Sequence, residues 1–590
     1  MKPDFIPTRQ LKRLAACCTT GLLLSLQPLA AQVLVKDIAP GASPSKPKDF
    51  KMVGSALFFT AETAATGREL YKSNGTAAGT VLVKDLWPGP GGSGFDGTGL
   101  EEFAAIGNTL YFAAKTSTTG YELWKTDGTA AGTVLVKDMI PGPTHSFPRD
   151  LTAKGNLLYF TVNSRAYGRE LWKSNGTPEG TVLVKDLRPG PAGSDPRALT
   201  VYDGSLFFLA DNGVSGIDVW KTNGFPEGTT LLKNLHPVDP GTLPELAVKD
   251  VRLYFTGPGP EPDIKYLYRS DGTAAGTVVV KEFNEGSASA EVTLGALTPS
   301  GALLYFIKRV RNQGTGDVFS LYRTSGTAAG TQLLKEIKTD ELGNSGTPMG
   351  NLTDVDGALY LTANSKWHGP ELWKSTGTPA QTKMVSDIRP GAYGSDPYGL
   401  RNVGGVLYFG AHNGTHGNEL WKSDGTAAGT VMVKDIFPGT GSAYPNAWAV
   451  HFGGLYFAAS NGTQGHELWK LSVPKPGPDG VTNQAAAGNP LVPDGGRAAS
   501  PESQGTAETG LRASVHPNPA ADHLSVQLDA PAPDLSSAVI DLTGKSFLLN
   551  AHQVTGPHQF RVDVSSLKPG LYLLRIATPR GRQSLRFVKQ

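Results

Sequence analysis

The sequence predicts an all-β protein: a closed β-propeller of about nine four-stranded repeats, followed by a small C-terminal β-sandwich. Three observations support this prediction: an apolar segment that recurs at nearly constant spacing, four short strand patterns in each repeat, and complementary ends of the repeated region. Glycine (73) and proline (43) make up about a fifth of the 590 residues, which favours short strands and tight turns over long helices.

The recurring segment is Val-Leu-Val-Lys-Asp, which first occurs at residues 33–37. Further copies lie at 81–85, 134–138, 182–186 and, with methionine in second place, 431–435. Looser copies begin at Thr230, Val278, Gln332 and Lys383, so that successive copies start 48 to 54 residues apart. Nine units at such a spacing are typical of a propeller or a solenoid.

Residues 182–229 illustrate one repeat. Apolar runs at 182–184, 199–202, 206–209 and 218–221 are separated by Pro-Gly, Asp-Gly and similar turn sequences. Four strands in about 40–50 residues fit one propeller blade. The Leu-Tyr-Phe run that recurs in the repeats, as at 158–160, is apolar at consecutive positions, which indicates a strand covered on both faces.

The two ends of the repeated region complement each other. The first unit starts at Val33 without a preceding Glu-Leu-Trp strand, and the last ends with Glu-Leu-Trp-Lys at 467–470 without a following Val-Leu-Val strand. We therefore expect the N-terminal strand to complete the last blade, which removes exposed strand edges. An open solenoid would instead need polar capping repeats. The spacing fits eight or nine blades, and we expect a monomer.

The repeat contains a longer motif, Glu-Leu-Trp-Lys-Thr-Asp-Gly-Thr at 122–129, with relatives at 170–177, 371–378 and 419–426. It resembles the ELWxxDGT repeat, also described as a hyalin-like repeat of bacterial surface and secreted proteins. The resemblance covers the predicted propeller, residues 32–470, and implies no particular activity. Units five and six depart from the motif, because Tyr-Leu-Tyr at 266–268 and Ser-Leu-Tyr at 320–322 replace Glu-Leu-Trp.

Residues 1–31 have the pattern of a secretory signal peptide. Four basic residues lie among the first 13, a mostly apolar stretch follows at 14–26, and small residues precede a cleavage site after Ala31. Cys17 and Cys18, the only cysteines, lie in this segment, so the mature chain is expected to hold no disulfide. The rest of the sequence contains no run of about 20 apolar residues, so it predicts no transmembrane segment.

The C-terminal part divides into two segments. Residues 471–514, rich in proline, glycine and alanine, predict a flexible linker. From residue 515, alternating strand patterns and turns predict a small antiparallel sandwich.

The C-terminal 76 residues, 515–590, also carry a set of motifs in a fixed order. They resemble the type A C-terminal sorting domain of the type IX (Por) secretion system, and the matching residues are Pro517, Asn518, Pro519, Gly544, Lys545, Gly570, Tyr572 and Lys589. The resemblance implies that residues 515–590 contact the type IX secretion machinery. It also implies export through the Sec route and across the outer membrane, so that the protein is secreted or lies on the cell surface.

Acidic residues recur in register in seven of the nine units: Glu69, Glu122, Glu170, Asp218, Glu371, Glu419 and Glu467. A glycosidase needs a single pair of carboxylates, whereas these residues repeat from blade to blade, so we predict a structural role for them. The recurring Lys-Asp pair is expected to form contacts between blades or within turns.

The Asp-Gly-Thr turns, as at 127–129, contain oxygen ligands that would suit calcium. The aspartate is asparagine, serine or threonine in other units, however, which favours an Asx-type turn. His412 and His416 lie four residues apart in a glycine-flanked loop and form at most a weak metal motif. No catalytic residue, metal or cofactor is therefore predicted.

The net charge of +2 argues against a nucleic-acid partner. Aromatic residues in predicted loops are the candidates for binding, because loops on a rigid scaffold often form binding surfaces. With their polar neighbours they are Trp87, Tyr167, Trp367, His368, Tyr393 and His416. Such side chains can stack on sugar rings, but local packing of the loops is the favoured explanation for them.

The leading functional hypothesis is a non-enzymatic propeller that binds a glycan or protein partner outside the cell, for example in adhesion. An alternative is a secreted polysaccharide-active enzyme with its site on the irregular repeats, residues 230–382. A third hypothesis is a surface-layer component that associates with its own copies.

Overall fold

The chain divides into two compact units, Met1–Pro474 and Lys475–Gln590. In the first unit, the computed structural model describes residues 32–94, 103–235, 244–259, 264–286, 290–311, 316–342, 348–451 and 454–472. In the second unit it describes residues 513–516, 523–528, 536–541, 546–547, 552–556, 559–565, 567, 570–578 and 581–589. The predicted signal peptide and almost all of the predicted linker lie outside these residues.

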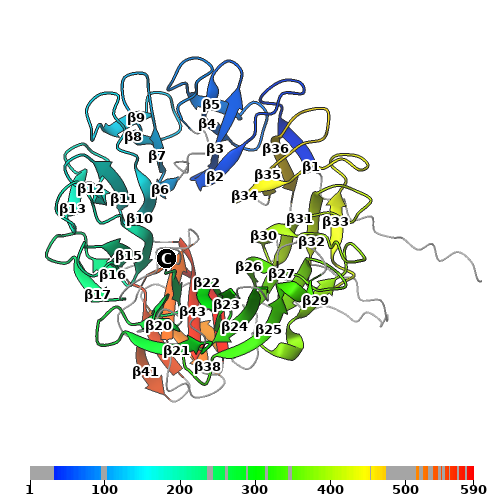
Figure 1. Ribbon diagram of the computed structural model, residues 1–590. Helices are drawn as coiled ribbons and strands as arrows, with labels where there is room; N and C mark the ends of the chain where they lie inside the picture. The colour runs from blue at the N-terminus through cyan, green and yellow to red at the C-terminus, as the bar shows by residue number, and fades with distance from the viewer. Residues whose placement is uncertain are drawn as a thin grey trace, which may run out of the picture. The chain divides into compact units, whose positions relative to one another are not determined.

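The first unit is a β-propeller of nine four-stranded antiparallel sheets arranged as a ring (Figure 1), and this confirms the predicted fold. The strands of each blade are given from the innermost to the outermost. Blade one contains β2 (Lys48–Val53), β3 (Ala56–Thr63), β4 (Gly67–Ser73) and β5 (Val81–Lys84), and blade two contains β6 (Ala104–Ile106), β7 (Thr109–Ala114), β8 (Glu122–Thr126) and β9 (Val134–Lys137). Blade three contains β10 (Arg149–Lys154), β11 (Leu157–Ser164), β12 (Gly168–Ser174) and β13 (Val182–Lys185).

Blade four contains β14 (Arg197–Tyr202), β15 (Ser205–Asp211), β16 (Ile217–Thr222) and β17 (Thr230–Lys233). Blade five contains β18 (Leu246–Lys249), β19 (Arg252–Pro258), β20 (Ile264–Ser270) and β21 (Val278–Asn284). Blade six contains β22 (Glu291–Ser300), β23 (Leu303–Arg311), β24 (Val318–Thr324) and β25 (Gln332–Lys338). Blade seven contains β26 (Met349–Val355), β27 (Ala358–Ala363), β28 (Glu371–Ser375) and β29 (Lys383–Ser386). Blade eight contains β30 (Tyr398–Val403), β31 (Val406–Ala411), β32 (Glu419–Ser423) and β33 (Val431–Lys434). Blade nine contains β34 (Asn446–His451), β35 (Gly454–Ala459), β36 (Glu467–Ser472) and β1 (Gln32–Lys36).

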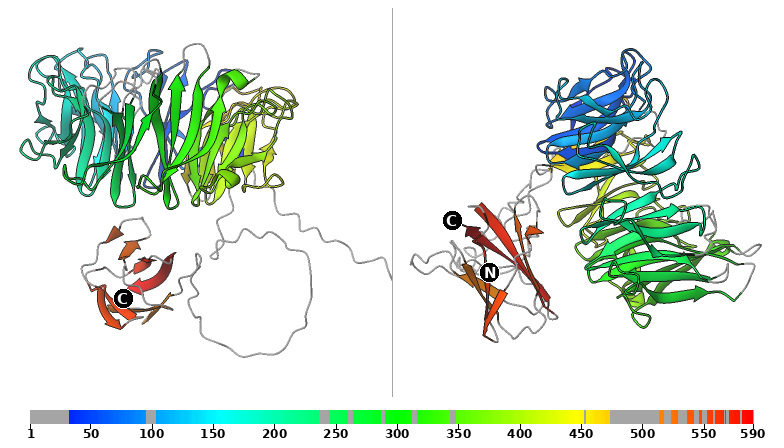
Figure 2. Two further views of the ribbon diagram at one scale, coloured as in Figure 1. Left: turned by 60° about the horizontal axis from the view of Figure 1, so that its bottom comes forward. Right: turned by 90° about the vertical axis from the view of Figure 1, so that its left-hand side faces the viewer.

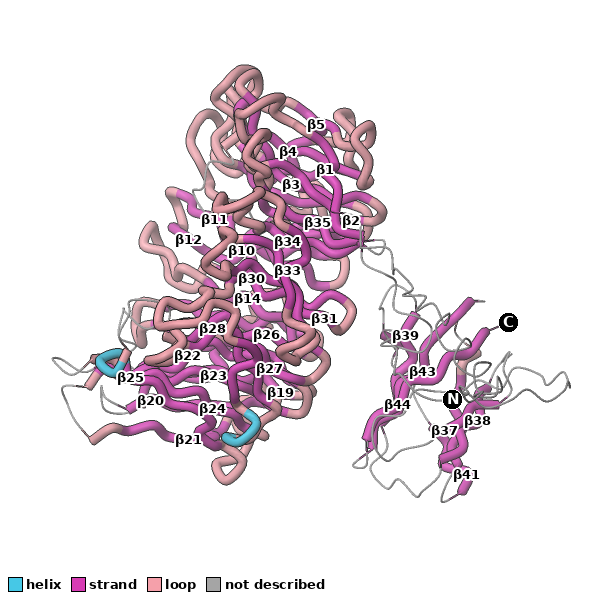
Figure 3. Tube along the Cα trace, turned by 90° about the vertical axis from the view of Figure 1, so that its right-hand side faces the viewer, coloured by secondary structure: helices cyan, strands magenta, loops and turns pink. Residues whose placement is uncertain are grey.

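Among the described residues, helical structure is limited to two short 3-10 turns, η1 (Thr339–Glu341) and η2 (Pro379–Gln381), drawn in cyan in Figure 3. Within that part of the chain, no helix has the length and apolar character needed to cross a membrane.

The N-terminal strand closes the ring, as the sequence predicted. β1 pairs antiparallel with β36, with Val33 opposite Lys470 and Leu34 opposite Trp469. The innermost strands contact one another in an unbroken circle that includes β2 against β34. The ninth blade therefore combines three strands from the end of the repeat region with one from its beginning.

The blades pack through both faces of their second strand, and this explains the continuous apolar runs in the sequence. Leu158 and Phe160 belong to a buried cluster that includes Tyr111 of the preceding blade. Tyr159 lies between them in the chain and packs with Phe208 of the following blade. Successive side chains of a strand point to opposite faces, so a strand between two blades needs apolar residues at every position.

The recurring lysine of Val-Leu-Val-Lys-Asp links one blade to the next, as expected. Lys137 Nζ donates a hydrogen bond to the carbonyl oxygen of Thr181 in the following blade at 2.8 Å. Lys36 Nζ makes the same bond to Thr80 across the point of closure, also at 2.8 Å. The aspartate that follows the lysine stays within its own turn, where Asp138 accepts a hydrogen bond from the amide four residues later.

The antiparallel strands place the connections on two opposite faces of the ring (Figure 2). We call one the loop face. It carries the turn between the second and third strands of each blade and the connection from each outermost strand to the next blade. The other, the turn face, carries the turns between the first and second strands and between the third and fourth strands.

The C-terminal unit consists of two four-stranded antiparallel sheets, in agreement with the predicted sandwich. In spatial order, one sheet contains β37 (Ala513–His516), β38 (His523–Leu528), β42 (Gln559–Asp563) and β41 (His552–Gly556). The other contains β40 (Ser546–Phe547), β39 (Ser536–Asp541), β43 (Gly570–Thr578) and β44 (Gly581–Lys589). Leu524, Val526, Val562 and Leu574 are buried and contribute to its core.

Ring closure predicts unequal effects of two substitutions in β1. Val35 is 6% exposed and packs against residues of blades one and nine, whereas Val33 is 47% exposed. We expect Val35→Asp to lower the free energy of unfolding by about 3 kcal/mol, because it buries an unpaired carboxylate. Val33→Asp, the matched control on the same strand, should cost less than about 1 kcal/mol.

Urea denaturation of both variants measures this difference. Equal and small effects would contradict closure of the ring by β1.

Candidate functional site on the loop face

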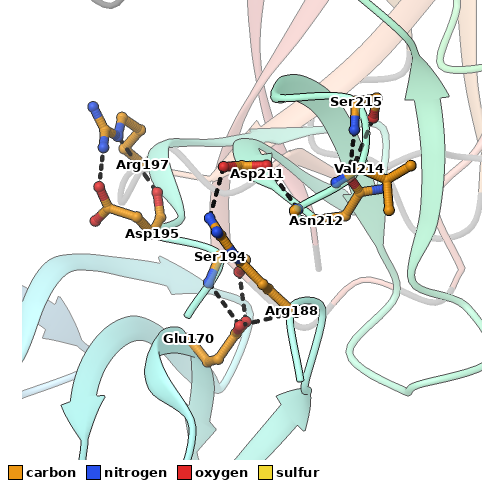
Figure 4. A network of polar contacts seen from close by, with 10 residues as sticks. Glu170, Arg188, Ser194, Asp195, Arg197, Asp211, Asn212, Val214 and Ser215 are labelled. Carbon is orange, nitrogen blue, oxygen red and sulfur yellow. Dashed lines mark hydrogen bonds and ion pairs between the residues drawn. The ribbon is translucent and has the colours of Figure 1, made fainter. Parts of the chain in front are cut away.

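The repeated glutamates are buried beneath the loop face and hold its connections in place. Glu371 accepts hydrogen bonds from the amides of Ile388 and Arg389, both at 3.1 Å, and from Ser395 Oγ at 2.6 Å. Figure 4 shows the same arrangement around Glu170, which accepts from the amides of Arg188 and Ser194. These side chains have no exposed surface, which agrees with the structural role predicted for them.

Burial also sets the protonation of these glutamates, because it disfavours the charged form. It raises the pKa of Glu371 to about 7, and the hydrogen bonds from Ser395, Arg389 and Ile388 oppose this rise. The pKa values of Glu69, Glu122 and Glu419 are raised to about 7 for the same reason. Burial likewise raises the pKa values of Glu170 and Glu467.

The Asp-Gly-Thr segments form Asx-type turns on the turn face, as predicted. Asp127 Oδ1 accepts hydrogen bonds from the Thr129 amide at 2.8 Å and from Thr129 Oγ1 at 2.7 Å. Asn175 makes equivalent bonds to Thr177, so a carboxylate is not required. In the described part of the chain, no group of three or more His, Cys, Asp or Glu side chains is placed to hold a metal ion.

All six sequence-predicted binding residues lie on the loop face. They come from three turns and two connections: Trp87 between β5 and β6, Tyr167 between β11 and β12, Trp367 and His368 between β27 and β28, Tyr393 between β29 and β30, and His416 between β31 and β32. The sequence identified loop residues one by one, and the topology places them on a common face.

Four of the six gather at blades seven and eight. Trp367 and Tyr393 are 71% and 75% exposed. The turn that carries Trp367 and His368 packs on the Tyr393 segment so closely that a Cβ atom on Gly369 would lie 2.5 Å from the Tyr393 carbonyl carbon. His416 lies in the adjacent turn of blade eight.

The other two candidates lie elsewhere on the loop face and do not join this group. Trp87 is half-buried in the connection from blade one to blade two, with Lys115 Nζ 5.0 Å from its ring centroid. Tyr167 is 39% exposed in the turn of blade three. Local packing therefore accounts for Trp87.

A cavity of about 220 Å³ opens in the loop face beside the cluster at blades seven and eight. Its lining comes from three neighbouring segments and includes Arg389, His412, Thr415, His416, Asn418 and Ser442. We call it the blade-eight cavity. Most of its lining surface is polar, so it suits a ligand rich in hydroxyl or charged groups.

Arg389 is the central charged group of this cavity. Its Nη1 atom lies 3.4 Å from Nδ1 and 3.3 Å from Nε2 of His412, and its guanidinium carbon lies 5.3 Å from the ring centroid of Tyr393. Burial lowers the pKa of His412, Arg389 lowers it further, and Asp396 opposes both. His412 is therefore neutral near pH 7, and the positive charge of the pair lies on Arg389.

Sequence reasoning did not select Arg389, and it considered His412 only as part of a weak metal motif. These two residues are 23 positions apart in the chain, so no local motif joins them. The available signal was the repetition of the same Arg-Pro-Gly segment, at 188–190 and again at 389–391.

A second cavity on the loop face, of about 640 Å³, lies over blade one. Its charged lining residues are Lys46, Lys48, Arg68 and one carboxylate, Glu62, which pairs with Arg68 at 2.8 Å and with Lys46 at 2.6 Å. The blade-eight cavity differs from it in having its arginine beside a highly exposed aromatic ring, Tyr393.

The irregular repeats, proposed as an enzyme site, have longer strands where the glutamate is lost. β21 and β25 contain seven residues each, compared with four in β13, and Tyr266 pairs with Glu282 along this extension. Phe283 fills the adjacent space by packing on Phe306 and Tyr322. Longer strands and aromatic packing therefore occupy this part of the irregular repeats.

The sequence singles out no acidic residue of these repeats as catalytic. Asp317 is paired with Arg309, and Asp340 lies in η1. Glu261 and Asp263 lie outside the described residues.

The C-terminal unit has a clear counterpart among known families. Residues 514–590 match the family model for the secretion system C-terminal sorting domain. The chain ends in a secretion sorting domain. This domain indicates export by the type IX system to the cell surface or the extracellular space. The match does not extend to the propeller, so membership of the ELWxxDGT repeat family stays a prediction.

The motif residues predicted for the sorting domain are only partly described. Gly570 and Tyr572 lie at the start of β43, and Lys589 ends β44 and pairs with Gly570. The remaining ones, Pro517, Asn518, Pro519, Gly544 and Lys545, lie outside the described residues.

A comparison with curated proteins finds no match. Among solved structures, the chain is similar to one of two prolyl endopeptidases studied for inter-domain dynamics, with 14% identity and a TM-score of 0.36; the match covers 63% of this chain and 55% of that one. It is also similar to the β-propeller domain of the Trilobed protease from Pyrococcus furiosus, with 12% identity and a TM-score of 0.30; the match covers 55% of this chain and 94% of that one. A third similar structure is puromycin hydrolase, with 14% identity and a TM-score of 0.32; the match covers 70% of this chain and 58% of that one. Likenesses this distant carry no argument about activity.

The raised pKa values predict that the protein loses stability between about pH 5 and pH 8. The folded-state pKa of Glu371 is about 7, above its ordinary value of 4.5, so folding takes up protons in this interval. The stabilisation is complete below the ordinary pKa of 4.5 and is lost as the pH rises through the folded-state pKa of about 7. We expect the free energy of unfolding, measured by urea denaturation, to fall with pH, and to fall less steeply in Glu371→Gln.

A free energy that rises with pH over this interval, or an unchanged slope in the variant, would show that the folded protein keeps these carboxylates ionised.

Proposed function

We propose that this protein is a non-enzymatic extracellular propeller that binds a glycan or protein partner through the loop face at blades seven and eight. The observation that carries the proposal is the combination of two highly exposed aromatic side chains, Trp367 and Tyr393, with a polar cavity whose Arg389 lies beside the Tyr393 ring. Exposed aromatic rings contribute large apolar contact areas at binding surfaces, and neighbouring polar groups supply orientation.

The rest of the molecule is consistent with this role. The repeated carboxylates are used for the internal structure of the blades, and the sorting domain indicates export. In this proposal, residues 1–31 act as a signal peptide, residues 32–470 form the binding domain, and the mature protein is a monomer. The type IX secretion machinery is its partner during export, and no cofactor takes part.

Loss of the exposed aromatic rings should weaken binding. We expect Trp367→Ala and Tyr393→Ala each to reduce affinity for a retained ligand about tenfold, because each ring contributes roughly 1.4 kcal/mol of contact. The ligand is found by testing the full chain against immobilised glycans and matrix proteins. Phe225→Ala is the matched control, since Phe225 is 59% exposed but lies on the turn face.

The same incubations are assayed for soluble products. Products released by the full chain would contradict a non-enzymatic role and favour the polysaccharide-active alternative. Equal loss of binding in the Phe225 variant would contradict the assignment to the loop face.

Removal of the sorting domain should block export. We expect a chain that ends at residue 513 to remain inside the cell envelope, whereas the full chain reaches the surface or the medium. Immunoblots of the medium, surface-protease-treated cells and periplasm measure this distribution. Deletion of residues 480–500, in the predicted linker, is the control and should leave export intact; export of the truncated chain would contradict the role of residues 514–590.

A further inference from the structure

Two connections on the loop face have nearly the same sequence and provide an internal comparison. Residues 188–196 read Arg-Pro-Gly-Pro-Ala-Gly-Ser-Asp-Pro, and residues 389–397 read Arg-Pro-Gly-Ala-Tyr-Gly-Ser-Asp-Pro. Both are held by a buried glutamate of the same repeat position, Glu170 and Glu371. Differences between the two sites therefore arise from a few side chains on a common backbone arrangement.

At the first site the arginine is neutralised. Arg188 Nη1 donates to Asp211 Oδ2 at 2.8 Å, an ion pair that joins the connection to the turn of blade four (Figure 4). Asp211 follows Arg188 by 23 residues, and the residue at the same distance from Arg389 is His412. The second site thus has an imidazole in place of the carboxylate.

Arg389 forms no ion pair among the described residues. Its only polar side-chain contact there is with the His412 ring. Asp396 is the nearby acidic group; burial raises its pKa, and His412 and Arg389 lower it. Asp435 is turned to the other histidine, with its Oδ2 atom 3.9 Å from His416 Nε2.

The second site also gains groups that the first site lacks. Tyr393 stands where the first connection has Ala192, and its ring lies beside the guanidinium group of Arg389 and is 75% exposed. His416 stands in place of Ser215. The loss of the carboxylate, the gain of an exposed ring and the blade-eight cavity coincide at one place.

We propose that the blade-eight cavity binds an acidic sugar residue of a polysaccharide, with the Arg389 guanidinium group on its carboxylate or sulfate and the Tyr393 ring against the face of the sugar. This inference rests on the proposed function and names its ligand class. The forked N–H donors of arginine match the oxygen atoms of such anions. Thr415, Asn418 and Ser442 line the cavity with groups that hydrogen-bond to sugar hydroxyls.

The test uses the full chain and two pairs of probes, polygalacturonate with its methyl ester, and dextran sulfate with dextran. We expect affinity, measured by biolayer interferometry, to be at least about tenfold higher for the charged member of one or both pairs, since hydrogen bonds to charged groups are stronger than neutral ones. The pair that responds identifies carboxylate or sulfate as the recognised group. Equal affinity for charged and neutral members, or no binding to any of the four, would overturn the inference.

His412→Asp converts the site to the arrangement at Arg188, where the arginine is neutralised. We expect this variant to lose at least about tenfold in affinity for the acidic polymer while keeping its melting temperature, because the same pair exists in blade four. Arg389→Gln should lose binding similarly, which covers the case in which the first variant fails to fold. Arg188→Gln is the matched control and should bind as the parent does.

Parental affinity in both His412→Asp and Arg389→Gln, or equal loss in Arg188→Gln, would overturn the inference. Such a result would not by itself overturn the proposed function. That proposal is tested separately, by measuring how the Trp367→Ala and Tyr393→Ala variants bind any glycan or matrix protein that the full chain retains.

Discussion

The pairing of β1 with β36 sets the geometry of the propeller, because it joins the two ends of a ring of nine sheets. Glu467 reinforces it by accepting hydrogen bonds from the amides of Ile38 and Ser45. Without this strand, the edge of β36 would be unpaired, and apolar residues shared between blades nine and one would be exposed to water. No cysteine follows Cys18, so non-covalent contacts hold the ring closed.

On the loop face, the buried glutamates hold the backbone of the connections, whereas the exposed side chains of these connections vary from blade to blade. Each one satisfies backbone amides of a connection, as Glu371 does for Ile388 and Arg389. A connection whose amides are satisfied from below keeps its course when its exposed side chains change. The loop face is therefore a fixed frame on which individual residues differ from blade to blade.

One pair of positions shows how far such changes go. In each case a residue of a connection contacts a residue at the junction between the second strand of the next blade and its following turn. Trp87 and Lys115 form a cation–π contact, Arg188 and Asp211 form an ion pair, and Arg389 contacts His412. The same place in the repeat thus supports three kinds of chemistry. In the last pair, a cationic group remains without a carboxylate partner in the described part of the chain.

The sequence by itself determined the strand pattern, the nine repeats, the closure and the structural role of the repeated glutamates. Each of these depends on local turn chemistry or on periodicity, which a single chain displays directly. It also selected Trp367, His368, Tyr393 and His416, because exposed loop aromatics and their neighbours stand out from the repeat. Only the tertiary structure decided that these four gather at two blades and that Trp87 and Tyr167 do not.

The role of Arg389 likewise came from the tertiary structure. Its meaning depends on His412, 23 residues away, and on the contrast with Arg188 and Asp211. Residues this far apart meet only because strand lengths and blade packing bring one connection against the next turn. Packing also decided that the irregular repeats fill their space with longer strands and with Phe283, since the loss of a glutamate in the sequence does not reveal what takes its place.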